Sequence, residues 1–173
     1  MDIITKTYDA LDGTHNAAIY SACEGYRYLL TRQWAPKKSS LVMLMLNPST
    51  ATELRNDPTI SRCERRAHMW GYGGLAILNI FAYRATEPKD MKAQSDPNGS
   101  YNDHYIKETL QSAKSEDIVC GWGTHGAHNN REAEIFEIFK TLGHTPRALK
   151  WTNNGHPQHP LYIGYKEMPK KLV

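Results

Sequence analysis

Continuous and alternating runs of apolar residues predict the strands of this chain. Residues 41–46 and 75–78 are continuous apolar runs, which are typical of parallel strands covered on both faces. Residues 26–34 alternate mostly with a period of two, which predicts an edge or half-exposed strand. Two further strands are predicted at residues 117–123 and 147–151. The chain therefore carries five strand candidates.

Helical patterns lie between these strands. Asp57 is a suitable N-cap and Pro58 a suitable first helical residue, so a helix is predicted from there to about Trp70. Residues 103–113 and 131–142 predict two more helices, and the second carries its apolar side chains on one face. Helices and strands thus follow one another along most of the chain.

This order of elements predicts an α/β fold of three layers, α/β/α, with a mainly parallel central sheet and right-handed crossovers. The 173 residues fit a single domain, with residues 1–24 as an N-terminal extension and 25–165 as the α/β core. Residues 87–102 are rich in Pro, Asp, Asn and Gly and predict a surface loop. Ligands of such sheets bind beyond the carboxyl ends of the strands, so the polar residues there are the candidates for function.

Composition and charge narrow the class of protein only slightly. A hydrophobic fraction of 40% and a formal net charge of +3 are those of an ordinary folded chain, and the small basic excess permits a polyanionic partner. The three cysteines lie far apart, which predicts neither a disulfide framework nor a zinc knuckle. Without a secretory signal or an apolar run of about 20 residues, we expect a cytoplasmic protein with no membrane partner.

Asn47 and Asp57 follow the most apolar strand. Asn47 can hold a water molecule or a substrate edge through both a donor and an acceptor, but Asn-Pro is also an ordinary turn. Asp57 is either a general base that activates water or only the helix cap, and one side chain can serve both purposes.

Asn79 closes the second buried strand. An asparagine there suits the reading of a base edge, and equally suits a structural role in satisfying loop backbone. Phe81 offers a stacking surface or a core residue, and Arg84 a phosphate contact.

A histidine loop and a glycine-rich turn complete the candidates. His156 and His159 are each followed by proline, so the loop is rigid enough to hold a histidine that stabilises an anion; the alternative is a turn with solvated histidines. Residues 121–126 predict a turn that binds an anion through backbone N–H groups near Thr124 and His125. The His-x-x-His pairs lack a third ligand at diagnostic spacing, so no metal is expected.

The familiar nucleotide and hydrolase motifs are missing. The chain has no G-x-G-x-x-G after a strand, no Walker A motif and no G-x-S-x-G elbow. We therefore expect no dinucleotide or other cofactor.

The chain resembles the bacterial and phage family called domain of unknown function 1643, from about Tyr26 to Tyr162. The shared motifs occur in order along the sequence. They are Tyr26-Arg27-Tyr28, Leu46-Asn47-Pro48-Ser49-Thr50-Ala51, Asp57-Pro58-Thr59, Trp70-Gly71-Tyr72-Gly73, Asn79-Ile80-Phe81-Ala82-Tyr83-Arg84-Ala85-Thr86, Trp122-Gly123 and Gly155-His156-Pro157-Gln158-His159-Pro160-Leu161-Tyr162.

A more distant resemblance is to the uracil-DNA glycosylase superfamily, which has a three-layer α/β/α fold. Leu46-Asn47-Pro48-Ser49 is similar to the superfamily's motif that positions the attacking water. Asn79 is similar to its base-reading asparagine, and His159, or failing that His156, to the histidine that stabilises the departing base. Ser49 stands where glycine is common, and no Ser follows His159-Pro160.

This resemblance implies hydrolysis of an N-glycosidic bond in DNA after the base is flipped out. The implied catalytic residues are Asn47, Asp57 and His159. Those implied to contact the base are Pro48, Ser49, Asn79, Phe81 and His156, and those implied to contact the DNA backbone are Arg84, Thr124 and His125. The departures favour a modified base, as in phage DNA, over uracil. We expect a monomer whose partner is single- or double-stranded DNA; the alternatives are a non-catalytic nucleic-acid-binding module and a hydrolase of free nucleotides or nucleosides.

Overall fold

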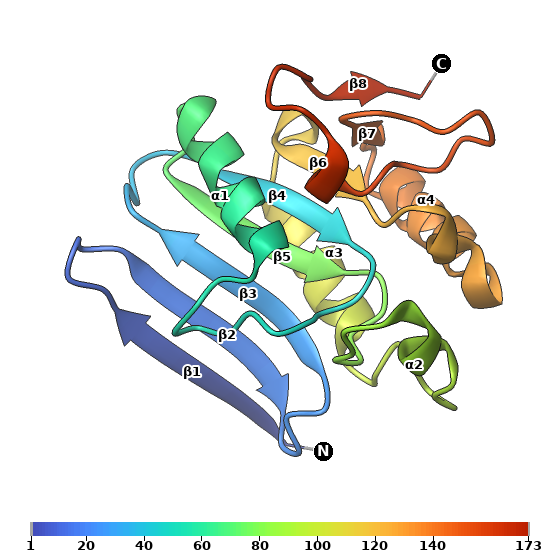
Figure 1. Ribbon diagram of the computed structural model, residues 1–173, viewed down its shortest axis with the longest axis horizontal. Coiled ribbons are helices and arrows are strands. Elements are labelled where there is room, and N and C mark those ends of the chain that lie inside the picture. The colour runs from blue at the N-terminus through green and yellow to red at the C-terminus, as the bar shows by residue number, and fades with distance from the viewer. Residues whose placement is uncertain (1, 173) are drawn as a thin grey trace.

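The computed structural model describes residues 2–172, which form a mixed α/β fold around one eight-stranded sheet (Figure 1). The strand order is β1-β2-β3-β5-β4-β6-β7-β8. The strands are β1 (Ile3–Asp9), β2 (His15–Ser21), β3 (Arg27–Gln33), β4 (Ser40–Met45), β5 (Gly74–Asn79), β6 (Ile118–Gly121), β7 (Arg147–Ala148) and β8 (Lys170–Lys171). The helices are α1 (Pro58–Met69), α2 (Pro88–Lys92), α3 (Asn102–Ser112) and α4 (Arg131–Thr141), with 3₁₀ helices η1 (Ser115–Asp117), η2 (Thr124–Asn130) and η3 (Pro160–Tyr162).

The sheet is mixed, so the prediction of a mainly parallel sheet was wrong. β4 pairs in parallel with β5 and β6, and β6 with β7. β1, β2, β3 and β5 pair antiparallel in succession, as do β7 and β8. The parallel pattern that we expected therefore holds only for the central strands.

An N-terminal hairpin accounts for most of this difference. β1 and β2 are joined by a tight turn in which Gly13 has φ +85° and Asp12 accepts a hydrogen bond from the Thr14 N–H at 2.9 Å. Asp12-Gly13 is a strong hairpin signal that was missing from the predicted elements. Because β2 covers one side of β3, and β5 the other, β3 is an interior strand rather than an edge.

The continuous apolar runs of β4 and β5 are explained by cover on both faces. On one face, Val42 and Leu44 pack into a core cluster with side chains of α3 and α4. On the other, Leu41 and Met43 pack with side chains of α1. Helices thus lie against both faces of the central strands, with α1 in front of the sheet in Figure 1.

The predicted central strands and the three longer helices are confirmed. Asp57 caps α1 through a hydrogen bond from the Ile60 N–H at 2.9 Å, as its position before Pro58 predicted. The predicted loop 87–102 contains the short helix α2, which was missed, and β7 is shorter than expected. Within residues 2–172, no helix has the length and apolar character needed to cross a membrane.

The chain connections place a crevice at the carboxyl ends of the central strands. From β4 the chain passes through α1 to β5 on one side, and β6 then pairs on the other side of β4. In open α/β sheets such a reversal of strand order marks the place where ligands bind.

Candidate functional site

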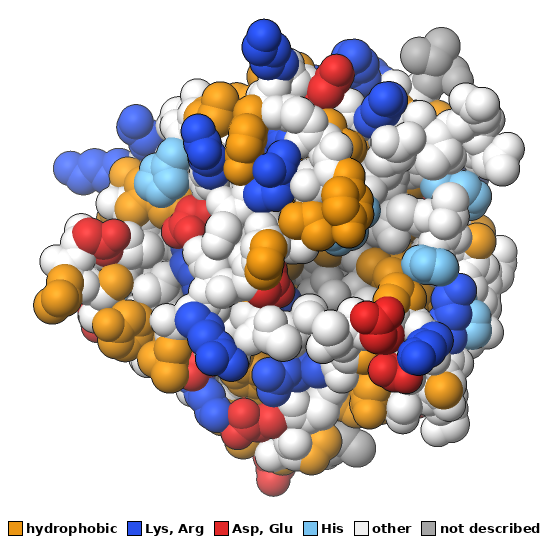
Figure 2. Space-filling view, in the orientation of Figure 1, with side chains coloured by type: hydrophobic (Ala, Val, Ile, Leu, Met, Phe, Trp, Pro, Cys, Tyr) orange, Lys and Arg blue, Asp and Glu red, His pale blue; other side chains and the backbone are white. Residues whose placement is uncertain are grey.

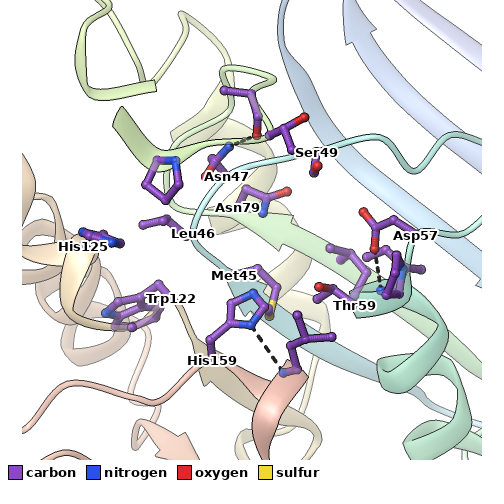
Figure 3. Close-up of a pocket in the computed structure, with 18 of the residues that line it drawn as sticks. Met45, Leu46, Asn47, Ser49, Asp57, Thr59, Asn79, Trp122, His125 and His159 are labelled. Carbon is purple, nitrogen blue, oxygen red and sulfur yellow. Dashed lines mark hydrogen bonds between the residues drawn. The ribbon is translucent and has the colours of Figure 1, made fainter. Parts of the chain in front are cut away.

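A cavity of about 660 Å³ opens at this end of the sheet, within the size range of small-molecule sites. Figure 2 shows a hollow near the centre of this face of the molecule, and Figure 3 shows the side chains around the cavity. Its walls come from the ends of β4, β5 and β6, the start of α1 and the segment around η3. The predicted site residues that line it are Asn47, Ser49, Asp57, Asn79, Thr124, His125 and His159.

Asn47 is held in place by its amide nitrogen. Its Nδ2 donates to the Ala85 carbonyl at 2.7 Å and to the Pro48 carbonyl at 3.1 Å. The Ala85 N–H in turn donates to the Pro48 carbonyl at 2.9 Å, so the loops after β4 and β5 are tied together. The Asn47 Oδ1 accepts no hydrogen bond from any of residues 2–172, which leaves an acceptor for a water proton or a ligand donor.

Asp57 combines the two roles that the sequence left open. One carboxylate oxygen caps α1, and the side chain also lines the cavity (Figure 3). Capping therefore fixes the position of a carboxylate beside the site, where its second oxygen can accept a proton or a hydrogen bond.

His159 faces the cavity as a neutral imidazole. Its Nδ1 accepts a hydrogen bond from the Leu161 N–H at 3.3 Å, so the ring proton resides on Nε2 (Figure 3). Burial lowers the pKa of His159, and the weaker opposing effect of the Asp57 charge does not reverse this. At neutral pH the site therefore holds a hydrogen-bond donor that carries no net charge.

His156, three residues earlier, belongs to a different network. Its Nδ1 lies 2.9 Å from Glu132 Oε1, and the same carboxylate accepts a hydrogen bond from the Trp122 indole N–H. His156 and Glu132 are both largely buried and lie outside the cavity lining. His156 thus anchors its loop to α4, and His159 is the histidine that faces the site.

Asn79 reaches the cavity with its orientation fixed by Arg27. Arg27 Nη2 donates to Asn79 Oδ1 at 3.4 Å, and because a guanidinium cannot accept, the amide oxygen must face it. The Asn79 Nδ2 has no acceptor among residues 2–172. The free group that Asn79 offers to a ligand is therefore a donor. Asn102 holds the strand end from behind by donating to the Asn79 carbonyl at 2.9 Å.

Arg27 lines the cavity and was not among the predicted site residues. It is 2% exposed, and its Nη1 donates to the Ala51 carbonyl at 2.7 Å. Its Nε has no acceptor, and no carboxylate within residues 2–172 forms an ion pair with it. Burial lowers the pKa of Arg27 to about 10, so it remains a cation at neutral pH. The sequence offered one indication of a role for Arg27, because it lies between Tyr26 and Tyr28 in the first of the motifs shared with the family.

Besides His156, three predicted site residues lie outside the cavity lining. Phe81 is fully buried in the core under α3 and α4, which supports its structural alternative. Pro48 is buried and contributes its carbonyl to the loop junction described above. Arg84 lines a second hollow, where its Nη1 donates to the Glu24 carbonyl at 3.0 Å and its guanidinium lies 5.2 Å from the Tyr20 ring centroid.

The glycine-rich turn does not form the expected anion site. It continues into the 3₁₀ helix η2, and the Gly123 and Gly126 N–H groups donate to the carbonyls of Pro157 and Gly123. Thr124 and His125 lie at the exposed rim of the cavity, where His125 Nδ1 is 3.1 Å from Lys92 Nζ. Burial and the Lys92 charge lower the pKa of His125.

The described part of the chain contains no group of three or more His, Cys, Asp or Glu side chains arranged to bind a metal ion. The three cysteines are free thiols, and burial raises the pKa of Cys63 to about 12. The polar side chains that line the cavity carry amides, hydroxyls, one carboxylate, imidazoles and one guanidinium.

Comparison with known proteins identifies the family. The profile of the DUF1643 family, described as "Protein of unknown function (DUF1643)", matches residues 27–161, which include every cavity element described above except part of the rim. No curated protein and no solved structure matches the chain significantly. The match spans well over half of the sequence, and the chain therefore belongs to the DUF1643 family.

Proposed function

We propose that the protein is a DNA glycosylase-like hydrolase that cleaves the N-glycosidic bond of a flipped, modified base in DNA, on a three-layer fold of the uracil-DNA glycosylase type. The observation that carries this proposal is the meeting of three complementary groups in one cavity. They are the free acceptor of Asn47, the free donor of Asn79 and the Nε2–H of His159.

In the proposed reaction, a water oxygen bonds to the sugar C1′ as the bond from C1′ to the base nitrogen breaks. Asn47 Oδ1 and Asp57 orient the water, and Asp57 accepts its proton. The bonding electrons leave with the base, which becomes an anion until it is protonated. The products are a free base and an abasic site.

His159 suits the stabilisation of that anion. A neutral Nε2–H donor aimed at the developing charge strengthens as the bond breaks, and a fixed donor of this kind contributes about 10²–10³ in rate. The buried Arg27 adds a positive potential behind Asn79, and in a site of low dielectric such a charge acts over several ångströms.

Asn79 gives the proposed site a preference among bases. Its free Nδ2 pairs with a hydrogen-bond acceptor, so the edge presented to it carries a carbonyl oxygen or a modification with an acceptor. A cavity of about 660 Å³ has room for a base enlarged by a substituent. The donor of Asn79 thus selects for an acceptor on the base, and the size of the cavity supports a modified base as substrate.

The test is to incubate the protein with plain DNA, uracil-containing DNA and phage DNAs that carry hypermodified bases. Abasic sites are then counted and released bases identified by mass spectrometry. Asn47→Ala serves as the control because it removes the free acceptor at the proposed water site. We expect abasic sites from at least one DNA and none with the variant. Binding without base release on any DNA would instead indicate a non-catalytic nucleic-acid-binding module.

A further inference from the structure

Three arginines of α1 surround one tyrosine ring outside the cavity. The guanidinium carbons of Arg62, Arg65 and Arg66 lie 4.5, 4.6 and 4.9 Å from the ring centroid of Tyr165. None of the three forms an ion pair with a carboxylate of residues 2–172. Glu167, two residues after Tyr165, pairs with Lys170 at 3.3 Å. A tyrosine face attracts cations but leaves their mutual repulsion in place, so this cluster favours a polyanionic partner.

Two of the arginines hold the cluster together. Arg66 is fully buried and donates to the carbonyls of Ile163 at 2.6 Å and Gly164 at 3.2 Å, and Arg62 donates to Ile163 at 2.7 Å. These bonds fix the segment that follows η3 against α1. Arg65 makes no such bond and is exposed, as is the neighbouring Lys166. The exposed pair is therefore available to a ligand.

The cluster lies next to the mouth of the cavity. α1 begins at the cavity wall with Pro58, and at about 1.5 Å per residue Arg65 lies only about 10 Å further along its axis. Tyr162, which lines the rim, is 88% exposed. In Figure 2, Lys and Arg side chains gather in the part of the view where Figure 1 places α1 and the C-terminal segment.

We propose that this arginine face, defined as Arg62, Arg65, Tyr165 and Lys166, binds the phosphates of the nucleic-acid strand that flank the nucleotide held in the cavity. The position of that nucleotide rests on the proposed function. A phosphate backbone fits because its regularly spaced charges neutralise several cations at once and release bound counterions. The exposed Tyr162 between the arginine face and the cavity offers a surface on which a neighbouring base stacks.

The test measures binding of the whole chain to fluorescent single- and double-stranded DNA by anisotropy across a range of salt concentrations. Arg65→Glu and Lys166→Glu are each expected to weaken binding roughly tenfold at low salt and to reduce the slope of log K against log salt by about 1. Lys107→Glu is the matched control, because Lys107 is exposed on α3 at the opposite face of the sheet. It should change neither quantity, and thermal unfolding should show all three variants folded.

Three results would overturn this assignment. They are no binding of either DNA by the wild-type protein, equal weakening by Lys107→Glu, and displacement of DNA by poly-glutamate at the same charge concentration. The last would indicate an acidic protein as the partner. DNA binding that depends on Arg65 and Lys166 without release of any base would leave the arginine face standing and contradict the proposed glycosylase.

Discussion

The α4 side and the cavity side of the molecule bury arginine in different ways. On the α4 side, Arg131 is 1% exposed, pairs with Asp103 and Glu134, and donates to the Ile80 carbonyl at 2.7 Å. On the cavity side, Arg27 and Arg66 are buried as deeply but bond only to neutral oxygens. A buried cation costs several kcal/mol unless it is compensated. The compensated arginine serves the fold. For the uncompensated ones, the functions proposed above assign the missing negative charge to a nucleic-acid ligand.

The two histidines of the C-terminal loop also differ in whether a carboxylate of the protein pairs with them. His156 is paired with Glu132 of α4, and His159 presents a free Nε2–H to the cavity. Residues three apart in one motif thus serve structure and site separately.

The largest effect is expected at His159. His159→Ala removes the proposed donor to the leaving base and should lower the rate of base release by about 10²–10³, with little change in the free energy of unfolding. His156→Ala is the matched variant, and it should retain the rate of base release per folded molecule. The rates are compared by single-turnover assay on the DNA that proves to be the substrate. A reversed pattern would show that the assignment of the two histidines is wrong.

Arg131 should give the largest loss of stability. Arg131→Met leaves the Ile80 carbonyl without its charged donor and removes two ion pairs, whose acids are about half exposed and so contribute little by themselves. We expect the free energy of unfolding to fall by about 2–3 kcal/mol. Urea denaturation measures this, with Lys107→Met on α3 as an exposed control.

The sequence indicated the cavity better than it indicated the residues behind it. Sequence patterns placed three of the site residues. Asn47 and Asn79 stand at the ends of apolar strands, and Asp57 stands where a helix begins. The ends of neighbouring parallel strands meet at one edge of the sheet, which brings these residues together. Arg27 could not be placed, because an arginine in an alternating strand looks solvent-exposed. The groups that its guanidinium contacts, the Ala51 carbonyl after β4 and Asn79 at the end of β5, lie far from it in the sequence. Phe81 was misjudged for the opposite reason. Its position after the end of a strand predicted a residue of the site, but its side chain packs into the core with side chains of α3 and α4.

The same limit applies to the sheet. The parallel strands could be predicted because continuous apolar runs require cover on both faces. The hairpin of β1 and β2 pairs through backbone bonds. β1 is largely exposed, and the alternate side chains that β2 buries include the polar Asn16, so neither strand shows an apolar alternation in its sequence. Only the Asp12-Gly13 turn marked it.

Arg27 should show the opposite behaviour to Arg131. Arg27→Met removes a desolvated charge but also two hydrogen bonds, and these terms are of similar size, so the free energy of unfolding should change by about 1 kcal/mol or less. Binding of DNA that carries the substrate base should weaken about tenfold, since Asn79 loses the group that orients it. Denaturation and binding are measured on the same samples. A loss of stability as large as that of Arg131→Met would make Arg27 a structural residue.

The smallest effect is expected from pH, through His159. Burial holds the pKa of His159 in the folded protein below the unfolded value of about 6.5. At pH values between these two pKa values, the unfolded chain therefore binds more protons than the folded protein. The stability from neutral His159 is therefore fully present above pH 6.5 and is lost as the pH falls through this interval. Protonation of Nδ1 also removes the acceptor of the Leu161 N–H, so the loop carrying the histidine loosens as it becomes charged. Denaturation of the wild type and of His159→Ala from pH 5 to 7.5 should show the steeper decline in the wild type. NMR titration of the His159 ring with a midpoint above 6.5 would contradict a neutral donor at the site.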